Sequence, residues 1–210
     1  MLLVGLTGNI ASGKSAVAAM LVAKGATLID ADVLARRAVR VGTPGYDAIV
    51  KRWGSEILSP DGVLDRAALR RRVFDNPDEL AQLNAIVHPE VGRMRDEMVA
   101  EATERGDRIV VADIPLLFEN NLIDDFDRIV LVDAPRPLRL ERLVRDRQLR
   151  ETEAMAMIAR QMPAELKRAR ADFVIDNDGT HEQLRARVEE VWRALDEEAS
   201  SRDTEAAAIP

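Results

Sequence analysis

The residues that point most directly to chemistry form a glycine-rich segment near the start of the chain. Residues 8–15, GNIASGKS, have the spacing G-x-x-x-x-G-K-[ST] of a loop that holds phosphate. Gly8 and Gly13 let the backbone turn sharply and bring N–H groups toward phosphate oxygens, where a side chain would obstruct them. In this pattern Lys14 reaches the β- and γ-phosphates, and the hydroxyl of Ser15 is a ligand for Mg²⁺. The segment therefore predicts a site for a nucleoside triphosphate and Mg²⁺.

Three aspartates follow short apolar runs that predict strands. Asp30 and Asp32 come after the run at 27–29, and Asp113 closes the run that begins near residue 109. Ligands of open α/β sheets lie beyond the carboxyl ends of the strands, so this edge should face the same crevice as the phosphate-binding loop. Transfer of phosphate to an alcohol needs a carboxylate that takes the hydroxyl proton, and Asp30 and Asp32 are both candidates. Either of them is alternatively a helix N-cap, whereas Asp113 has the position of a carboxylate that binds Mg²⁺.

A third group of candidates lies in a basic stretch. Residues 136–170 carry ten basic and five acidic side chains, although the chain as a whole has a net charge of −7. Arg139, Arg142 and Arg145 recur at a spacing of three, which keeps them near one face of a helix. Such donors can neutralise a transferring phosphoryl group when a lid closes, whereas a solvated helix face is the alternative for each arginine taken singly. For the whole cluster we predict a function.

The composition sets the class of protein. The chain has 210 residues, of which 47% are hydrophobic, 32% charged and 3% aromatic, so aliphatic side chains must fill a sizeable core. It has no cysteine, which excludes disulfides, cysteine metal sites and a thiol nucleophile. The acidic balance argues against a broad nucleic-acid or membrane interface, and the first apolar run is too short for a signal peptide or a membrane span. We therefore expect a cytoplasmic enzyme without nucleic-acid or membrane partners.

The elements that must position these residues alternate as in an α/β fold. The apolar run at 2–6 predicts a strand and the pattern at 14–25 a helix, so the glycines lie between strand and helix, as a phosphate-binding loop requires. Further runs predict four more strands, at about residues 27–29, 108–113, 128–133 and 173–175. A final helix is expected at about 181–198, followed by a tail that frays because it has few bulky apolar residues.

The middle of the chain has a different pattern. Residues 42–106 consist of helical pieces interrupted by prolines, without a strong strand, and we predict a helical insertion of the kind that caps a second substrate. His88 precedes a proline in this insertion. A lone histidine is more often structural, and neither a second histidine nor a cysteine has the spacing of a metal ligand.

In order and spacing, several segments resemble the dephospho-CoA kinase family over about residues 1–198. They are GLTGNIASGKS, DADVLAR, GVLDRAALRRRVF, IVHPEV, DIPLLFE and ADFVIDNDG. The phosphate-binding loop alone is generic, and it is DAD after the second strand, HP in the insertion and PLLFE after the third strand that make the resemblance specific. The resemblance implies transfer of the γ-phosphate of Mg·ATP to the ribose 3′-hydroxyl of dephospho-CoA, the last step of coenzyme A synthesis.

The resemblance also implies a fold. It is an α/β, three-layer P-loop kinase fold with a five-stranded parallel sheet, a helical substrate-binding insertion and an arginine-rich lid. One kinase domain is expected over residues 1–198. Its core is expected at about 1–41, 107–135 and 171–198, the acceptor-binding insertion at about 42–106, the lid at about 136–170 and a flexible tail at 199–210.

Roles for individual residues follow from the same resemblance. Asp32, rather than Asp30, matches the proposed general base of the family. The catalytic residues are then expected to be Asp32, Lys14 and Arg142, and the metal ligands Ser15 and Asp113. The residues expected to bind ATP are Gly8, Asn9, Ile10, Ala11, Ser12, Gly13, Lys14, Ser15, Ala16, Arg142, Asn177 and Gly179. The residues expected to bind the acceptor are Asp32, Arg36, Arg66, His88, Pro115 and Leu116.

Two departures from the family pattern and three alternatives accompany these predictions. Asn9 and Ala11 occupy variable positions of the loop that often hold small residues or glycine, and Asp146 stands where an arginine is expected, between Arg145 and Arg147.

A GTPase would need an N-K-x-D segment and a D-x-x-G after the third strand, and neither is present. Another small-molecule kinase of this fold and an ATP-binding regulatory protein remain as alternatives. We make no prediction of the oligomeric state.

Overall fold

The computed structural model describes residues 1–74 and 76–207. Contacts between Cα atoms divide the chain into two compact units. The first unit contains residues 1–29 and the chain from Ala102 onward, and the second is Asp30–Glu101.

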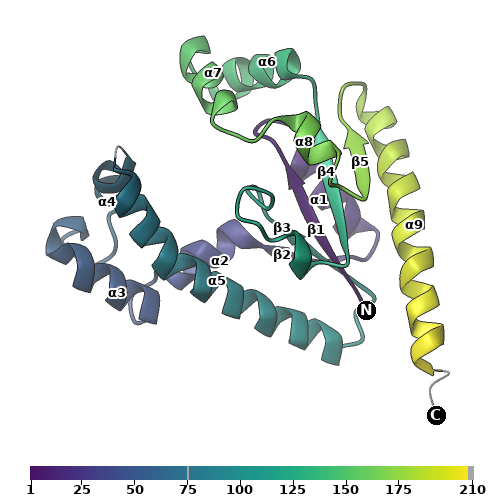
Figure 1. The fold of residues 1–210 in the computed structure, drawn as a ribbon, viewed down its shortest axis with the longest axis horizontal. Helices are drawn as coiled ribbons and strands as arrows, with labels where there is room; N and C mark the ends of the chain where they lie inside the picture. Colours follow the sequence, from purple (N-terminus) through teal and green to yellow (C-terminus); the bar gives the residue numbers. More distant parts are fainter. Residues whose placement is uncertain (75, 208–210) are drawn as a thin grey trace. The chain divides into compact units, whose positions relative to one another are not determined.

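A five-stranded parallel sheet is the centre of the first unit (Figure 1). Its strands are β1 (Leu2–Gly8), β2 (Thr27–Asp30), β3 (Ile109–Asp113), β4 (Arg128–Asp133) and β5 (Phe173–Asp176). Their order in the sheet is β2-β3-β1-β4-β5, with β1 paired in parallel to both β3 and β4. The central strands are continuous apolar runs that are buried along almost their whole length, as expected of a parallel sheet covered on both faces. The predicted sheet is confirmed.

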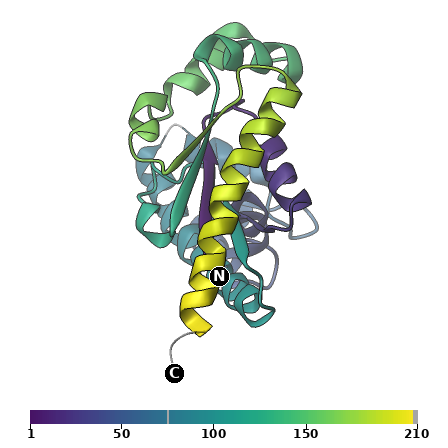
Figure 2. The same ribbon diagram turned by 90° about the vertical axis from the view of Figure 1, so that its right-hand side faces the viewer.

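Two helices cover one face of this sheet. They are α1 (Lys14–Ala23) and α9 (His181–Ala207), and Figure 2 shows α9 running along the sheet. Leu2, Val4 and Leu6 of β1 alternate toward these helices and form a core with residues of both. On the opposite face β1 has Gly5, where a Cβ atom would lie 2.7 Å from Leu117 in the loop after β3. The missing side chain therefore lets this loop pack closely against the sheet.

Three shorter helices lie between β4 and β5. They are α6 (Arg136–Arg147), α7 (Glu151–Ala159) and α8 (Ala164–Arg168). α6 and α7 share a small apolar cluster of Leu143, Ala154 and Ile158. This segment is the predicted lid region. A 3-10 turn, η2 (Ile123–Asp125), precedes β4.

The predicted end of the last helix is wrong. We expected a helix to about residue 198 and then a flexible tail, but α9 continues to Ala207. Ala199 is completely buried in the core, and Arg202 pairs with Glu198 and Asp127. Small buried residues and ion pairs thus stabilise a segment that lacks bulky apolar side chains. Residues 208–210, the end of the predicted tail, lie outside the described residues.

The second unit is helical, as predicted for the insertion. It contains α2 (Ala31–Ala38), α3 (Pro44–Trp53), the 3-10 turn η1 (Gly54–Ile57), α4 (Arg66–Phe74) and most of α5 (Pro77–Glu104). Its own core consists of Ile49, Trp53, Ile57, Leu64, Leu69 and Val73. The unit begins at Asp30, so it includes α2, which we had placed before the insertion. None of the helices in the described part of the chain is both long and apolar enough to span a membrane.

Candidate active site

The phosphate-binding loop joins the carboxyl end of β1 to the first turn of α1, as predicted. Gly13 is the N-cap of α1 and has a φ of 93°, a conformation that favours glycine. Among the described residues, the backbone N–H groups of Gly13, Lys14 and Ser15 donate no hydrogen bond. Free amides at the positive end of a helix form a site for an anion such as phosphate.

Both glycines of the motif also have neighbours that leave no room for a side chain. A Cβ atom on Gly8 would lie 2.6 Å from the Oγ of Ser12 and 2.6 Å from the carbonyl oxygen of Val132. A Cβ atom on Gly13 would collide with the side-chain amide of Asn177. The loop therefore needs glycine at these positions for its own packing as well as for phosphate.

Lys14 and Asp113 form an ion pair at the carboxyl edge of the sheet. β1 and β3 are neighbours in register Leu6 to Asp113, so the end of β3 lies directly beside the start of the loop. Asp113 is almost fully buried, and Ser15 is exposed one residue beyond the lysine. The structure thus brings the predicted phosphate-binding lysine against one of the two predicted Mg²⁺ ligands.

The donor set of Ser15 and Asp113 fits Mg²⁺, which prefers oxygen ligands and often takes only one or two of them from the protein. The remaining ligands then come from the phosphates of the substrate and from water. No cluster of three or more His, Cys, Asp or Glu side chains that could hold a metal ion occurs in the described part of the chain.

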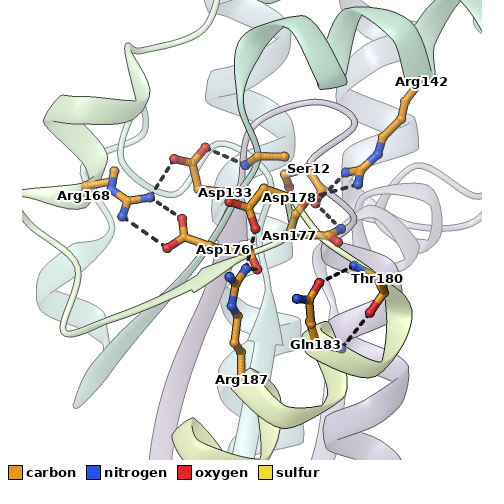
Figure 3. Close-up of polar contacts among 11 residues, drawn as sticks. Ser12, Asp133, Arg142, Arg168, Asp176, Asn177, Asp178, Thr180, Gln183 and Arg187 are labelled. Atoms are coloured by element: carbon orange, nitrogen blue, oxygen red, sulfur yellow. Dashed lines mark hydrogen bonds and ion pairs between the residues drawn. The ribbon is translucent and has the colours of Figure 1, made fainter.

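Arg142 of α6 contacts the phosphate-binding loop and the loop after β5 (Figure 3). Its Nη1 donates to the carbonyl oxygens of Ala11 and Ser12, at 3.1 and 3.3 Å, and its Nη2 donates to that of Asn177 at 2.9 Å. The Nδ2 of Asn177 donates in turn to the carbonyl oxygen of Ser12, at 2.8 Å. One guanidinium therefore ties the predicted phosphate and adenine loops together. The sequence indicated neither these backbone partners of Arg142 nor the role of the Asn177 side chain.

The other two arginines of the predicted cluster have different surroundings. Arg139 is buried, donates from Nε to the carbonyl oxygen of Ala134 at 3.0 Å, and has its pKa lowered by burial. Arg145 is exposed and bonds to Asp146, which raises the pKa of Arg145. Of the three, only Arg142 has a described contact with the phosphate-binding loop. The near-regular spacing had suggested one shared face, but each step of three residues rotates the side chain around the helix.

The variable residues of the loop contact the lid region. Ile10 and Ala11 pack against the apolar cluster of α6 and α7, and Ala11 adopts a φ of 60°. Glycine adopts this left-handed conformation more readily than alanine. The amide of Ala16 donates to the carbonyl oxygen of Gly13. The predicted contact of Ala16 with ATP stays a prediction.

The predicted adenine loop, residues 177–179, is held from both sides (Figure 3). Arg168 of α8 donates to Asp133 at 3.0 Å and to Asp176 at 2.6 Å, and these bonds raise the pKa of its guanidinium. On the other side Arg187 of α9 bonds to Asp178 at 2.6 Å, which lowers the pKa of that carboxyl group.

A capping box closes the same loop. Thr180 accepts from the amide of Gln183 at 3.2 Å, and the Gln183 side chain accepts from the amide of Thr180 at 2.8 Å. The same glutamine side chain occupies the space that a Cβ atom on Gly179 would need. A side chain at residue 179 would therefore displace the glutamine from its bond with Thr180.

In the second unit, the structure separates the two candidate carboxylates. Asp30 is the N-cap of α2, and its Oδ1 accepts from the amide of Val33 at 3.0 Å. Asp32 lies in the first turn of α2, is exposed, and makes no hydrogen bond or ion pair within the described residues. The capping role therefore belongs to Asp30, which leaves the carboxylate of Asp32 available for a substrate.

The other predicted acceptor residues are divided between the units. Within the second unit, Arg66 donates to the carbonyl oxygen of Arg36 at 3.5 Å, and His88 is exposed on α5. Pro115 and Leu116 belong to the first unit, in the loop after β3, where the side chain of Leu116 is 43% exposed. Their roles toward the acceptor stay predictions.

The sheet order, the glycine-rich turn at the start of α1 and the helical unit inserted after β2 are the features of a P-loop kinase fold. The family Dephospho-CoA kinase matches residues 2–183, and the chain belongs to this family. A dephospho-CoA kinase of Thermobifida fusca is 50% identical over 202 residues, which are 96% of this chain and 100% of that protein.

Solved structures give the same result for the fold. A Thermus thermophilus protein has a TM-score of 0.80 and 38% identity, over 92% of this chain and 97% of its own. A dephospho-CoA kinase from Campylobacter jejuni has a TM-score of 0.63 over 92% of this chain and 96% of its own. Its identity of 22% shows a shared fold alone.

Proposed function

We propose that the chain transfers the γ-phosphate of ATP to the ribose 3′-hydroxyl of dephospho-CoA, with Asp32 as the general base. The transferase activity follows from membership of the family, and the alternatives of another small-molecule kinase or a non-catalytic ATP-binding protein are not favoured. The observation that supports Asp32 is that its carboxylate has no partner within the described residues, whereas the neighbouring Asp30 is already used as a helix cap. Mg²⁺ and a cytoplasmic location are parts of the proposal.

The donor side of the reaction uses the phosphate-binding loop. The free amides at the start of α1 bind phosphate oxygens, and Lys14 leaves its ion pair with Asp113 to contact the β- and γ-phosphates. Asp113 and Ser15 would hold Mg²⁺, which would supply positive charge to the β- and γ-phosphates. Asn177 and Gly179 place the adenine, and Arg142 stabilises the charge that spreads over the transferring group.

The acceptor side needs one proton transfer. The 3′-oxygen forms a bond to the γ-phosphorus while the bond from that phosphorus to the oxygen bridging it to the β-phosphate breaks. The carboxylate of Asp32 accepts the proton of the hydroxyl, and ADP leaves with the bridging oxygen. A nucleoside monophosphate kinase would have no need of this carboxylate, since its acceptor is already an anion.

Deoxy analogues of the acceptor test the position of transfer. We expect 2′-deoxy-dephospho-CoA to support ADP release and the 3′-deoxy analogue to support none, because only the former keeps the reacting hydroxyl. ADP release is followed by a coupled assay, and competition against dephospho-CoA shows whether each analogue binds. Turnover of the 3′-deoxy analogue, with none for the 2′-deoxy analogue, would show that the phosphate is transferred to the 2′-hydroxyl and would contradict the proposal.

A further inference from the structure

A short segment of the lid region holds the tip of the phosphate-binding loop. We call residues 161–168, which include α8, the strap. The side-chain carbonyl of Gln161 accepts from the amide of Ile10 at 2.7 Å, and the backbone carbonyl of Met162 accepts from the side chain of Asn9 at 3.4 Å. Ile10 and Asn9 are the first two variable residues of the loop, so the strap determines the course of the chain just before the phosphate-binding amides.

The far end of the strap contacts the adenine loop. Arg168 joins Asp133, at the end of β4, to Asp176, at the end of β5 (Figure 3). The amide of Asn177 also bonds to the carbonyl oxygen of Asp133, at 2.7 Å. The strap is therefore connected to the predicted phosphate and adenine parts of the ATP site at the same time.

The strap is anchored by an ion pair between a fully buried lysine, Lys167, and a glutamate, Glu119, whose side chain is 21% exposed. The side chain of Lys167 is 0% exposed, and its Nζ lies 2.7 Å from the Oε1 of Glu119. The same Oε1 accepts from the amide of Met162 at 3.1 Å. The ammonium also lies 6.0 Å from the centre of the Phe118 ring. Glu119 thus provides both the charge that compensates Lys167 and the acceptor that fixes Met162.

A buried ion pair is a poor way to stabilise a fold, because desolvation of the two charges offsets much of their attraction. A well-packed apolar pair of similar volume is often as stable. The location of this pair is more informative than its energy. Its glutamate also accepts from Met162, whose carbonyl oxygen accepts from Asn9, and Glu119 ends the DIPLLFE segment, in which Asp113, Pro115 and Leu116 had predicted roles.

We propose that Glu119 is a positioning residue for ATP: through Lys167 and the Met162 amide it fixes the strap, which in turn shapes the phosphate-binding loop. The strap is accordingly a fixed part of the donor site. The proposal concerns the donor site and rests on ATP as the substrate. It does not depend on which acceptor is used.

Three variants separate positioning from stability. Glu119→Gln leaves Lys167 buried without a counter-charge, whereas the double variant Glu119→Leu/Lys167→Met removes both charges and the acceptor for Met162. Gln161→Ala removes only the contact with Ile10. The measurements are KM for ATP, KM for dephospho-CoA, kcat, the unfolding temperature, and the Kd of ADP by calorimetry, which requires no acceptor.

We expect Glu119→Gln to lower the unfolding temperature and the double variant to recover most of that loss. In all three variants KM for ATP and the Kd of ADP should rise by about tenfold or more, while KM for dephospho-CoA changes less than about twofold. The matched control is Glu198→Gln, which removes a carboxylate that pairs with Arg128 and Arg202 away from the ATP site. It should leave the Kd of ADP unchanged.

The proposal is overturned if the double variant binds ADP as the unmodified chain does, since the pair would then be structural only. It is also overturned if KM rises equally for both substrates. If the unmodified chain binds ADP but does not phosphorylate dephospho-CoA, the proposed function is wrong. The proposal for Glu119 is then still tested by the Kd of ADP in the three variants.

Discussion

The variant Asp32→Asn is expected to lower kcat by about 10²-fold or more, while KM for ATP changes less than about twofold. Asparagine has nearly the same shape as aspartate and can still accept a hydrogen bond from the 3′-hydroxyl, but it cannot take the proton. Orientation is therefore kept and general-base catalysis is lost. Steady-state rates of ADP release at saturating dephospho-CoA measure the effect.

Asp30→Asn is the matched control for this variant. Asparagine is as good an N-cap as aspartate, so α2 should start normally and kcat should change less than about threefold. If Asp32→Asn turns over at a near-normal rate, Asp32 is not the base. If Asp30→Asn loses as much activity as Asp32→Asn, the division of roles between the cap and the base is wrong.

The variant Gly13→Ala is expected to lower kcat/KM for ATP by about 10²-fold or more, because it disturbs the loop at the point where the free amides begin. The new methyl group would collide with the side chain of Asn177, and alanine also disfavours the φ of 93°. Both loops that Arg142 joins would then have to move. Kinetics with ATP as the varied substrate, together with the Kd of ADP, measure the loss.

The comparison variant is Gly25→Ala, at the other end of α1. Gly25 has a φ of 107°, but a Cβ atom there would meet nothing within 4 Å. It therefore reproduces the backbone strain of Gly13→Ala without the collision. For Gly25→Ala we expect a lower unfolding temperature and an unchanged KM for ATP. If KM for ATP rises equally in Gly13→Ala and Gly25→Ala, the contact with Asn177 is irrelevant to ATP binding.

Much of the fold was predictable because its determinants are local in the sequence. Buried parallel strands such as β3 and β4 are short runs of aliphatic residues, and the glycine-rich segment marks the turn between β1 and α1. The end of α9 was not predictable in this way. The ion pair of Arg202 with Asp127 joins residues far apart in the sequence, and a low content of bulky residues says nothing about it.

The site was predictable where a motif encodes the chemistry, as for Lys14 and Asp113, which the structure places in contact. The strap was missed because its key contacts pair Gln161 and Lys167 with residues that precede them by many positions. The sequence does not distinguish a fully buried lysine from the other basic residues of a stretch that is rich in them. The paired aspartates at the ends of β4 and β5, with arginines nearby in the sequence, were the one available sign of the Arg168 contacts.

The central claim is that a hydroxyl of dephospho-CoA, rather than a phosphate, accepts the transferred group. The most direct test is a coupled ADP-release assay with ATP and three acceptors, dephospho-CoA, adenosine and AMP, at equal concentrations. We predict that kcat/KM for dephospho-CoA exceeds the values for adenosine and AMP by at least about 10²-fold, because only dephospho-CoA would make the full set of proposed acceptor contacts. A higher kcat/KM for AMP than for dephospho-CoA would contradict the account.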